Sequence, residues 1–275
     1  YLIQKNLIFM DQTTAKVLSK PKYRKLRYIH YFYPELKRYL TDEQLKESIE
    51  KDINEFGDET YEQLRLQGEN EQKVCELIRN DSLDDFISHV TENKISLFSP
   101  IQTSIFETNT FLIKNDSTLI EYAAFFGSIQ IFKYLFSNNS KITSDLWLYA
   151  IHGKNLEIIQ LLEQRPVRPR DQSFAQVLDE SFKCQNGEVT TYIIEKLLRL
   201  RKGEELPILA QSTKHYDYAH FPNDLNNQFT FCYLCQADHF SLISDLVKLS
   251  NRNFKLNTQI ASVFCQISYK VSIYF

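Results

Sequence analysis

Two stretches near the middle of the chain carry the same pattern of residues. Residues 118–135 align without a gap on residues 145–162, at an offset of 27 residues. Each stretch opens with a short apolar segment that contains a pair of small or aliphatic residues, Ala123 and Ala124 in the first copy, followed by a break and a longer apolar stripe. A fixed internal period of this length is typical of stacked structural repeats. We therefore expect each copy to fold as two helices joined by a tight turn.

Weaker copies of this pattern lie on both sides of the duplicated pair. Two short amphipathic segments flank a turn at residues 80–82, a degenerate copy covers residues 181–194, and another covers residues 232–249. Residues 199–231 interrupt the repeat pattern, and we expect them to form an insertion or a long finger-like loop. The expected turn positions of the other units are Gly127, Lys154, Gln185 and Asp238.

The expected organisation therefore has two parts. Residues 1–70 form an α-helical N-terminal region, and residues 71–275 form an irregular repeat domain whose clearest repeats are 118–144 and 145–175. A hydrophobic content of 43% over 275 residues is enough for a substantial core.

The composition argues against several classes of protein. A net charge of −3 creates no global field that would attract nucleic acid or an anionic membrane. The six glycines are too dispersed for a phosphate-binding loop, and no run of about 18 apolar residues predicts a membrane span. The five cysteines are scattered and odd in number, which favours reduced thiols and a cytoplasmic location. No cofactor is expected.

The first 93 residues reverse their charge partway along. Residues 1–40 contain nine Lys or Arg against two acids, and residues 41–93 contain 16 acids against five bases. The basic, Tyr-rich part, residues 16–40, could bind nucleic acid through phosphate contacts and base stacking. Its aromatic residues could instead form the core of a small helical cap whose bases face the acidic segment. We favour the cap, because the charge reversal supplies a partner within the chain.

Helix signals in this region are local. Pro21 and Pro34 each fit a helix start, so we expect short helices at about 22–33 and 34–40. Residues 41–44 have the spacing of a capping box, and the helix that follows is expected to end at Gly57.

The first clear repeat reads Thr-Leu-Ile-Glu-Tyr-Ala-Ala-Phe-Phe-Gly at residues 118–127. It resembles the ankyrin signature Thr-Pro-Leu-His-x-Ala, with Leu119 in place of the proline and Glu121 in place of the histidine. Residues 121–132 and 146–153 more closely resemble an ankyrin-repeat family of unknown function expanded in trichomonad parasites. The resemblance covers roughly residues 71–255. It implies an all-α, ankyrin-type solenoid that binds a protein partner without catalysis, through its concave face and loop tips.

The resemblance also implies where a partner would bind. Positions after the small pair usually face the concave surface of ankyrin repeats, and an exposed group of aromatic residues there would suit protein recognition. Other parts of the chain could instead cover these side chains. Trp147 aligns with a core position, and we expect it to be buried. The expected partner-binding residues are Tyr122, Phe125, Phe126, Tyr149 and His152.

One motif invites a different function. Cys232 and Cys235, followed by His239, could bind zinc, either as a zinc-stabilised module or as a metal-dependent enzyme. This spacing supplies only three ligands, and Cys235 aligns with Ala124, where a small buried residue is expected. No Ser/His/Asp or Cys/His set has a recognisable spacing, so we expect no enzyme activity.

Overall fold

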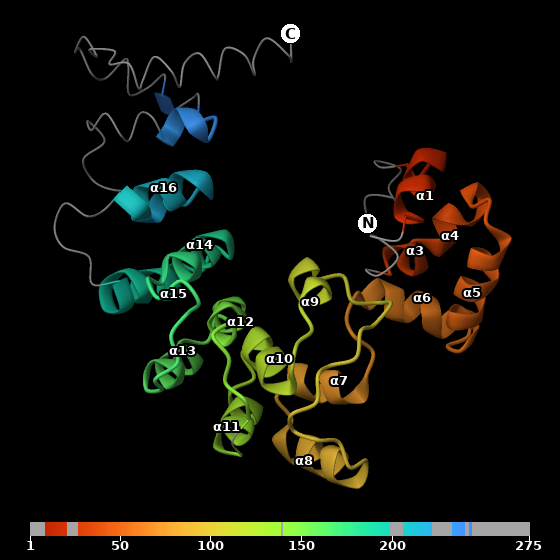
Figure 1. Ribbon diagram of the computed structural model, residues 1–275, viewed down its shortest axis with the longest axis horizontal. Coiled ribbons are helices and arrows are strands. Elements are labelled where there is room, and N and C mark those ends of the chain that lie inside the picture. The colour runs from red at the N-terminus through yellow and green to blue at the C-terminus, as the bar shows by residue number, and fades with distance from the viewer. Residues whose placement is uncertain are drawn as a thin grey trace. The chain divides into compact units, whose positions relative to one another are not determined.

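The described part of the chain is built from helices (Figure 1). The computed structural model describes residues 9–20, 27–138, 140–198, 206–221, 233–239 and 242–243. Within these ranges no strand forms, and one isolated bridge joins Pro100 to Thr118. The all-α prediction is therefore confirmed for these residues. Their helices include none with the length and apolar character needed to cross a membrane.

The contacts divide the chain into two compact units, residues 1–141 and 142–275. The division falls between the two clear repeats, and the expected boundary after residue 70 lies inside the first unit. The reason is found in the N-terminal helices and in the connection that precedes the first clear repeat. Each unit is described separately below.

The first unit begins with a group of short helices. The expected helix start at Pro21 lies outside the described residues, and the helical segments after it are shorter than expected. Asp42, rather than Thr41, caps α5, because its carboxylate accepts a hydrogen bond from the backbone of Leu45 at 3.0 Å. The helices are α1 (Gln12–Leu18), α3 (Tyr28–Tyr31), α4 (Tyr33–Leu36), the 3-10 helix η1 (Lys37–Tyr39), α5 (Glu43–Asn54) and α6 (Asp58–Gln67).

These helices share a core with a segment that is distant in sequence. Phe106, in the connection before the first clear repeat, is completely buried among them and contacts the rings of Phe56 and Tyr61, with centroids 5.0 and 5.6 Å away. Thr108 lies against the backbone of Gly68 and donates to its carbonyl oxygen. Because residues 105–108 complete this core, the N-terminal helices and the first repeats form one unit.

Lys37 and His30 of this region contact acidic residues of the segment that follows. The ammonium group of Lys37 lies 2.6 Å from the carboxylate of Glu50, which also accepts a hydrogen bond from the hydroxyl of Tyr33 at 2.7 Å. Nε2 of His30 lies 3.0 Å from the carboxylate of Asp52. Lys22, Arg24 and Lys25 lie outside the described residues.

Helical hairpins follow, and their turns repeat one backbone conformation. A residue one or two positions after the first helix of each hairpin has a positive φ, and the expected turns at 127, 154, 185 and 238 are therefore confirmed. The hairpins are α7 (Lys73–Arg79) with α8 (Leu83–Glu92), α10 (Leu119–Phe126) with α11 (Ile129–Ser137), α12 (Leu146–His152) with α13 (Leu156–Glu163), and α14 (Ala175–Lys183) with α15 (Gly187–Tyr192). The φ values are 51° at Asp81, 71° at Gly127, 53° at Lys154, 50° at Gln185 and 59° at Asp238.

A π-helical segment, η2 (Ile193–Leu198), extends α15, and a further turn of the same kind lies where we expected an insertion. α16 (Leu206–Lys214) is followed by Tyr216 with φ 58° and by a 3-10 helix, η3 (Tyr218–His220). The amides of Tyr216 and the next residue bond to the carbonyls of Thr213 and Ser212, as the amides of Gly127 and its successor bond to the small pair of their unit. Residues 206–220 are thus a helix–turn unit in phase with the array.

The apolar pattern of the clear repeats is missing from this unit because its small pair is polar. Ser212 and Thr213 are completely or almost completely buried, and both hydroxyls donate to the carbonyl oxygen of Leu209 inside their own helix. Such internal hydrogen bonds allow a hydroxyl to occupy a core position. Ser and Thr can therefore stand where the clear repeats have Ala.

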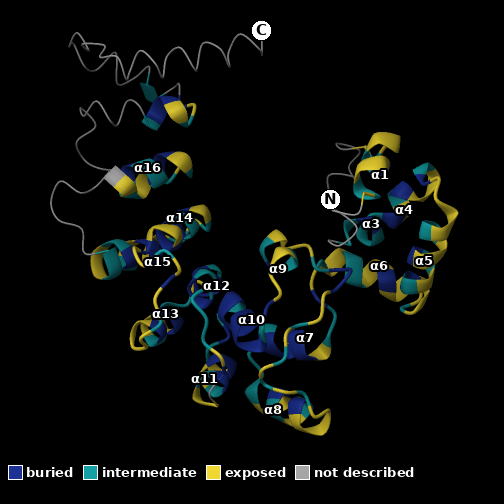
Figure 2. Ribbon diagram, in the orientation of Figure 1, coloured by how far each residue is buried: buried dark blue, intermediate teal, exposed yellow. Residues whose placement is uncertain are grey.

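Within each unit, apolar side chains pack between the helices of the repeats, and most of α10 is dark blue in Figure 2. Ile131, Phe132 and Leu135 in α11 are completely buried, as are the corresponding Ile and Leu residues of α13. Trp147 is 1% exposed, as expected, and its indole N–H donates to the carbonyl of Val167 at 3.0 Å.

Candidate functional site

The predicted aromatic surface in the first unit is largely buried. Tyr122 is 1% and Phe125 is 8% exposed, so the expectation of exposure is wrong for both. Phe111, in the connecting helix α9 (Thr110–Lys114), stacks on Phe125 with ring centroids 5.8 Å apart. Arg79 of the preceding hairpin donates a hydrogen bond to the hydroxyl of Tyr122 at 2.9 Å.

Phe126 alone among the predicted aromatic residues of this unit is partly exposed. Its ring lies 4.7 Å from that of Tyr122, and the guanidinium of Arg79 lies over it at 6.0 Å. A cation over an aromatic face stabilises both side chains. Phe126 therefore borders a packed cluster instead of an open apolar surface.

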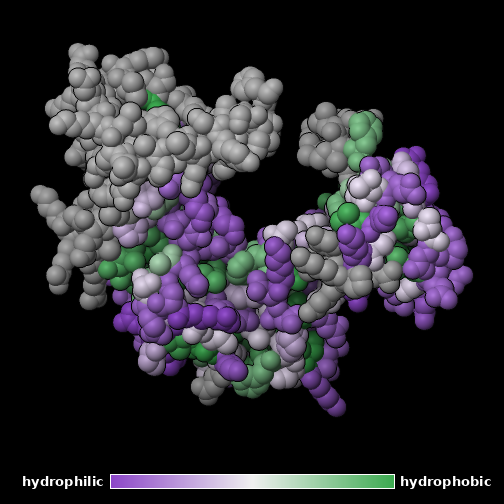
Figure 3. Space-filling view, turned by 45° about the horizontal axis from the view of Figure 1, so that its top comes forward, coloured by the Kyte–Doolittle hydropathy of each residue, from purple (hydrophilic) through white to green (hydrophobic). Residues whose placement is uncertain are grey.

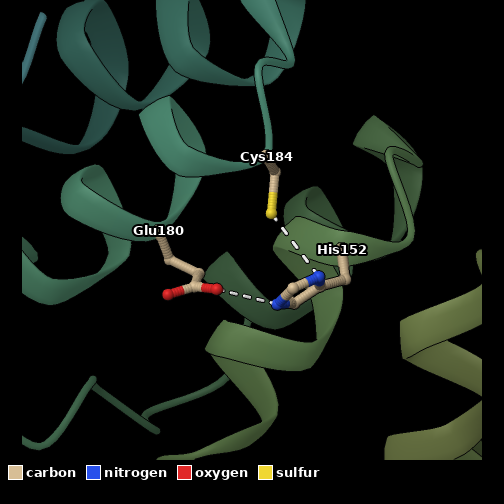
Figure 4. A group of neighbouring side chains, drawn as sticks. All are labelled: His152, Glu180 and Cys184. Carbon is tan, nitrogen blue, oxygen red and sulfur yellow. Dashed lines mark hydrogen bonds and ion pairs between the residues drawn. The ribbon is translucent and has the colours of Figure 1, made fainter. Parts of the chain in front are cut away.

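In the second unit, Tyr149 is 3% exposed, and the expectation of exposure is wrong for this residue too. His152 is half-buried and belongs to a polar cluster (Figure 4). Its Nε2 lies 2.8 Å from the carboxylate of Glu180, and its Nδ1 lies 3.5 Å from Sγ of Cys184. These three are the His, Cys or acidic residues of the described ranges that lie close enough together to share a metal ion.

The repeat places His152 beside Glu180. His152 stands two residues before the turn of its hairpin, and Glu180 stands five residues before the turn of the next. Arg79 and Tyr122 occupy the same two positions in the first unit, and they also form a hydrogen bond. This pair of positions is therefore a recurrent polar link between consecutive hairpins. The separate repeats reveal it only when their turns are aligned.

The charges of the cluster are set by its contacts. The hydrogen bond from His152 lowers the pKa of Glu180, which Lys183 also contacts at 3.0 Å. Glu180 is thus an anion and accepts a hydrogen bond from the N–H that is assigned to Nε2 of His152. Nδ1 of the same ring faces the thiol of Cys184.

Cys184 remains a thiol at neutral pH. Burial, assisted by the charge of Glu180, raises the pKa of Cys184 to about 11. Cys184 also caps the C-terminus of α14, where the helix dipole disfavours a negative charge. Reactive cysteines need the opposite environment. Cys184, His152 and Glu180 thus contact one another in the order of a catalytic thiol, imidazole and carboxylate, but the thiol is not activated as a thiolate.

The sequence-predicted zinc motif is only partly described. Cys232 lies outside the described residues. Cys235 is 2% exposed, as expected for the position of Ala124. His239 is buried and uses both ring nitrogens, with Nε2 2.7 Å from the carbonyl of Thr213 and Nδ1 3.0 Å from the hydroxyl of Tyr218.

Exposed aromatic side chains occur instead around the turn at Tyr216. Tyr216 is 52% and Tyr218 is 56% exposed. Tyr216 and the half-buried Tyr233 line an open groove with about 800 Å³ of unfilled space, counting solvent at its mouth. Lys214 and Gln236 also line this groove, which lies between the first helices of two consecutive repeats. We call it the tyrosine groove.

Besides its two tyrosines, the groove is lined by polar side chains such as those of Gln211, Gln236 and Asp238. On the face shown in Figure 3, hydrophobic residues form separate patches among hydrophilic ones. The aromatic cluster at residues 215–220 was visible in the sequence but was assigned to an insertion. The Ser212–Thr213 pair, placed before Tyr216 as Ala123–Ala124 is placed before Gly127, is the signal that would have identified it as repeat surface.

Comparisons with known proteins identify no relative of this chain. Neither models of protein families, nor curated proteins, nor solved structures match the chain.

Proposed function

We propose that this chain is a non-catalytic binding protein built from ankyrin-type repeats, and that its ligand is another protein. The observation that carries the proposal is the tyrosine groove, which two consecutive repeats form with the ends of their first helices. Binding would therefore use the type of position that the resemblance to ankyrin repeats indicates, but in a later pair of repeats than the sequence favoured.

The regular turns support the ankyrin-type interpretation. Each turn directs the first helix of its hairpin in the same way, because one residue adopts the left-handed conformation and the residue after it begins the second helix. Within each unit, equivalent positions then recur on one side of successive first helices. In repeat proteins this arrangement produces extended binding surfaces.

The chemistry of the groove favours a protein ligand. Tyrosine offers a large rigid ring and a hydroxyl, and it is enriched among the residues that dominate binding energy in protein interfaces. Tyr216 and Tyr233 provide two such rings, while Gln236 and Lys214 add hydrogen-bond donors at the edge. The charge of Lys214 is offset by Asp179, whose carboxylate lies 2.6 Å away.

The test is to obstruct the groove without disturbing its walls. Gln236 is exposed, so Gln236→Arg places a long charged side chain in the groove with little effect on folding. Gln160→Arg is the matched control, because Gln160 is also exposed, lies on α13 and does not line the groove. Quantitative affinity purification should recover the same proteins with the wild type and Gln160→Arg.

We expect Gln236→Arg to lose those proteins at least in part, and crosslinks from a photoreactive residue at position 236 to reach them. Recovery at the wild-type level with Gln236→Arg, in a chain with an unchanged circular dichroism spectrum, would exclude the groove as the binding site.

A further inference from the structure

The cluster at His152 contains two metal-binding atoms at the spacing found in tetrahedral zinc sites. Sγ of Cys184 lies 3.5 Å from Nδ1 of His152. Zinc bonds are about 2.3 Å to sulfur and about 2.0–2.1 Å to nitrogen, so a tetrahedral angle separates the two ligand atoms by about 3.6 Å. The spacing of these two atoms is therefore the one that a shared ion requires.

We infer that Cys184 and His152 bind a Zn²⁺ ion, and that Glu180 is the positioning residue that orients the imidazole. This inference is independent of the tyrosine groove and of the proposed protein ligand.

The third residue of the cluster supplies the orientation that a zinc ligand needs. A metal-bound histidine almost always donates its other ring N–H to a carboxylate, a carbonyl or a water. The carboxylate of Glu180 lies 2.8 Å from Nε2, while the thiol of Cys184 meets the ring at Nδ1 (Figure 4). The carboxylate and the thiol thus contact different nitrogens, so Glu180 holds the ring while Nδ1 binds the ion.

The side chains of His152 and Glu180 are 17% and 13% exposed, so the cluster is not completely closed to solvent. Two water molecules would complete the tetrahedron. On binding, the S–H bond of Cys184 breaks, an S–Zn bond forms and the proton passes to water, without any redox change. Thiolate and imidazole ligands favour Zn²⁺ over Mg²⁺ or Ca²⁺, which prefer oxygen.

Cobalt provides a direct test, because Co²⁺ occupies zinc sites and its thiolate complexes absorb in the near ultraviolet. The full chain, reduced and free of metal, is titrated with Co²⁺ and then with Zn²⁺. We expect one Co²⁺ per chain with thiolate absorption, which Zn²⁺ abolishes and Mg²⁺ leaves unchanged. In addition, Zn²⁺ should protect Cys184 of the wild-type chain from alkylation.

Three variants separate the roles of the residues. Cys184→Ala should abolish the thiolate absorption. Cys235→Ala is the matched control and should retain it, since alanine suits that buried position. Glu180→Gln should keep the absorption but weaken binding about 10–100-fold, the usual effect of removing an orienting carboxylate.

Several results would overturn the inference. They are a wild-type titration without thiolate absorption, absorption that persists in Cys184→Ala, and alkylation of Cys184 that Zn²⁺ does not slow. Loss of the signal in Cys235→Ala alone would assign the metal to the Cys232 motif instead. Unchanged affinity in Glu180→Gln would remove the role given to Glu180.

Discussion

Replacing Lys154 with glycine should stabilise the second unit. Lys154 lies two residues after the end of α12 and has a φ of 53°, a conformation in which the Cβ of any L-residue approaches the following carbonyl oxygen. The equivalent position in the preceding repeat is Gly127, which has no Cβ and adopts a φ of 71°. The substitution therefore makes the less regular repeat match the more regular one.

The expected gain follows from two opposing effects. Removing the Cβ relieves about 1–2 kcal/mol of conformational strain. Glycine also gives the unfolded chain more freedom, which costs about 0.4–1 kcal/mol. The net expectation is about 1 kcal/mol of added stability. With a urea dependence of about 1–3 kcal/mol per molar, the unfolding midpoint should rise by about 0.5 M.

The chain supplies its own reporter for this measurement. Trp147 is the single tryptophan, it is buried in the second unit, and its fluorescence should change when that unit unfolds. Lys154→Ala is the control, because it removes the same charge and the same long side chain but keeps the Cβ. We expect the Ala variant to remain close to the wild type.

A Gly variant no more stable than the Ala variant would refute the reasoning. It would mean that the left-handed conformation at residue 154 costs nothing in this turn, or that the backbone there differs from the one described.

Two further predictions concern the first unit. The carboxylate of Asp81 accepts hydrogen bonds from the backbone amides of Gln130 and Ile131 at 3.0–3.1 Å and so caps α11. We therefore expect Asp81→Ala to lower the free energy of unfolding in urea by about 1–2 kcal/mol. Asp81→Asn should keep most of this stability. Equal midpoints for the Ala and Asn variants would contradict the capping role. Burial lowers the pKa of His30 below its usual 6.5 despite the hydrogen bond to Asp52. The neutral form of His30 therefore stabilises the fold above about pH 6.5, and this stability is lost as the pH drops through the pKa of His30 in the folded chain. Stability measured by circular dichroism should therefore decline less between about pH 7.5 and about pH 5.5 in His30→Gln than in the wild type, and parallel declines would argue against His30 as the source.

The turns could be predicted from the sequence because their signal is local. A small pair, a turn residue after the helix and a polar residue that precedes the next helix occupy fixed positions within a short segment, as in Ala123–Ser128. This pattern survives the replacement of glycine by Lys154 or Asp238. It was missed at Tyr216 because Ser212 and Thr213 are polar, and their burial depends on hydrogen bonds that a hydropathy pattern does not reveal.

Surface exposure was harder to predict, because it depends on residues from other parts of the chain. Phe125 is covered by Phe111 of the connection, and Tyr122 by Arg79 of an earlier hairpin, 43 residues away. The proximity of Glu180 and Cys184 to His152 also crosses hairpins, at separations of 28 and 32 residues. Only the alignment of successive turns brings such positions together, and it cannot indicate which side chains a connection covers.

The burial of Phe106 bears on how the protein can be divided for experiments. A fragment that starts at residue 71, where the sequence places the repeat domain, would carry Ile105 and Phe106 without the helices that enclose them. The complementary N-terminal fragment would have a hole where these side chains belong. Both fragments would expose apolar surface and tend to aggregate. Expression of residues 1–141 keeps these contacts intact, so studies of isolated pieces should cut the chain there.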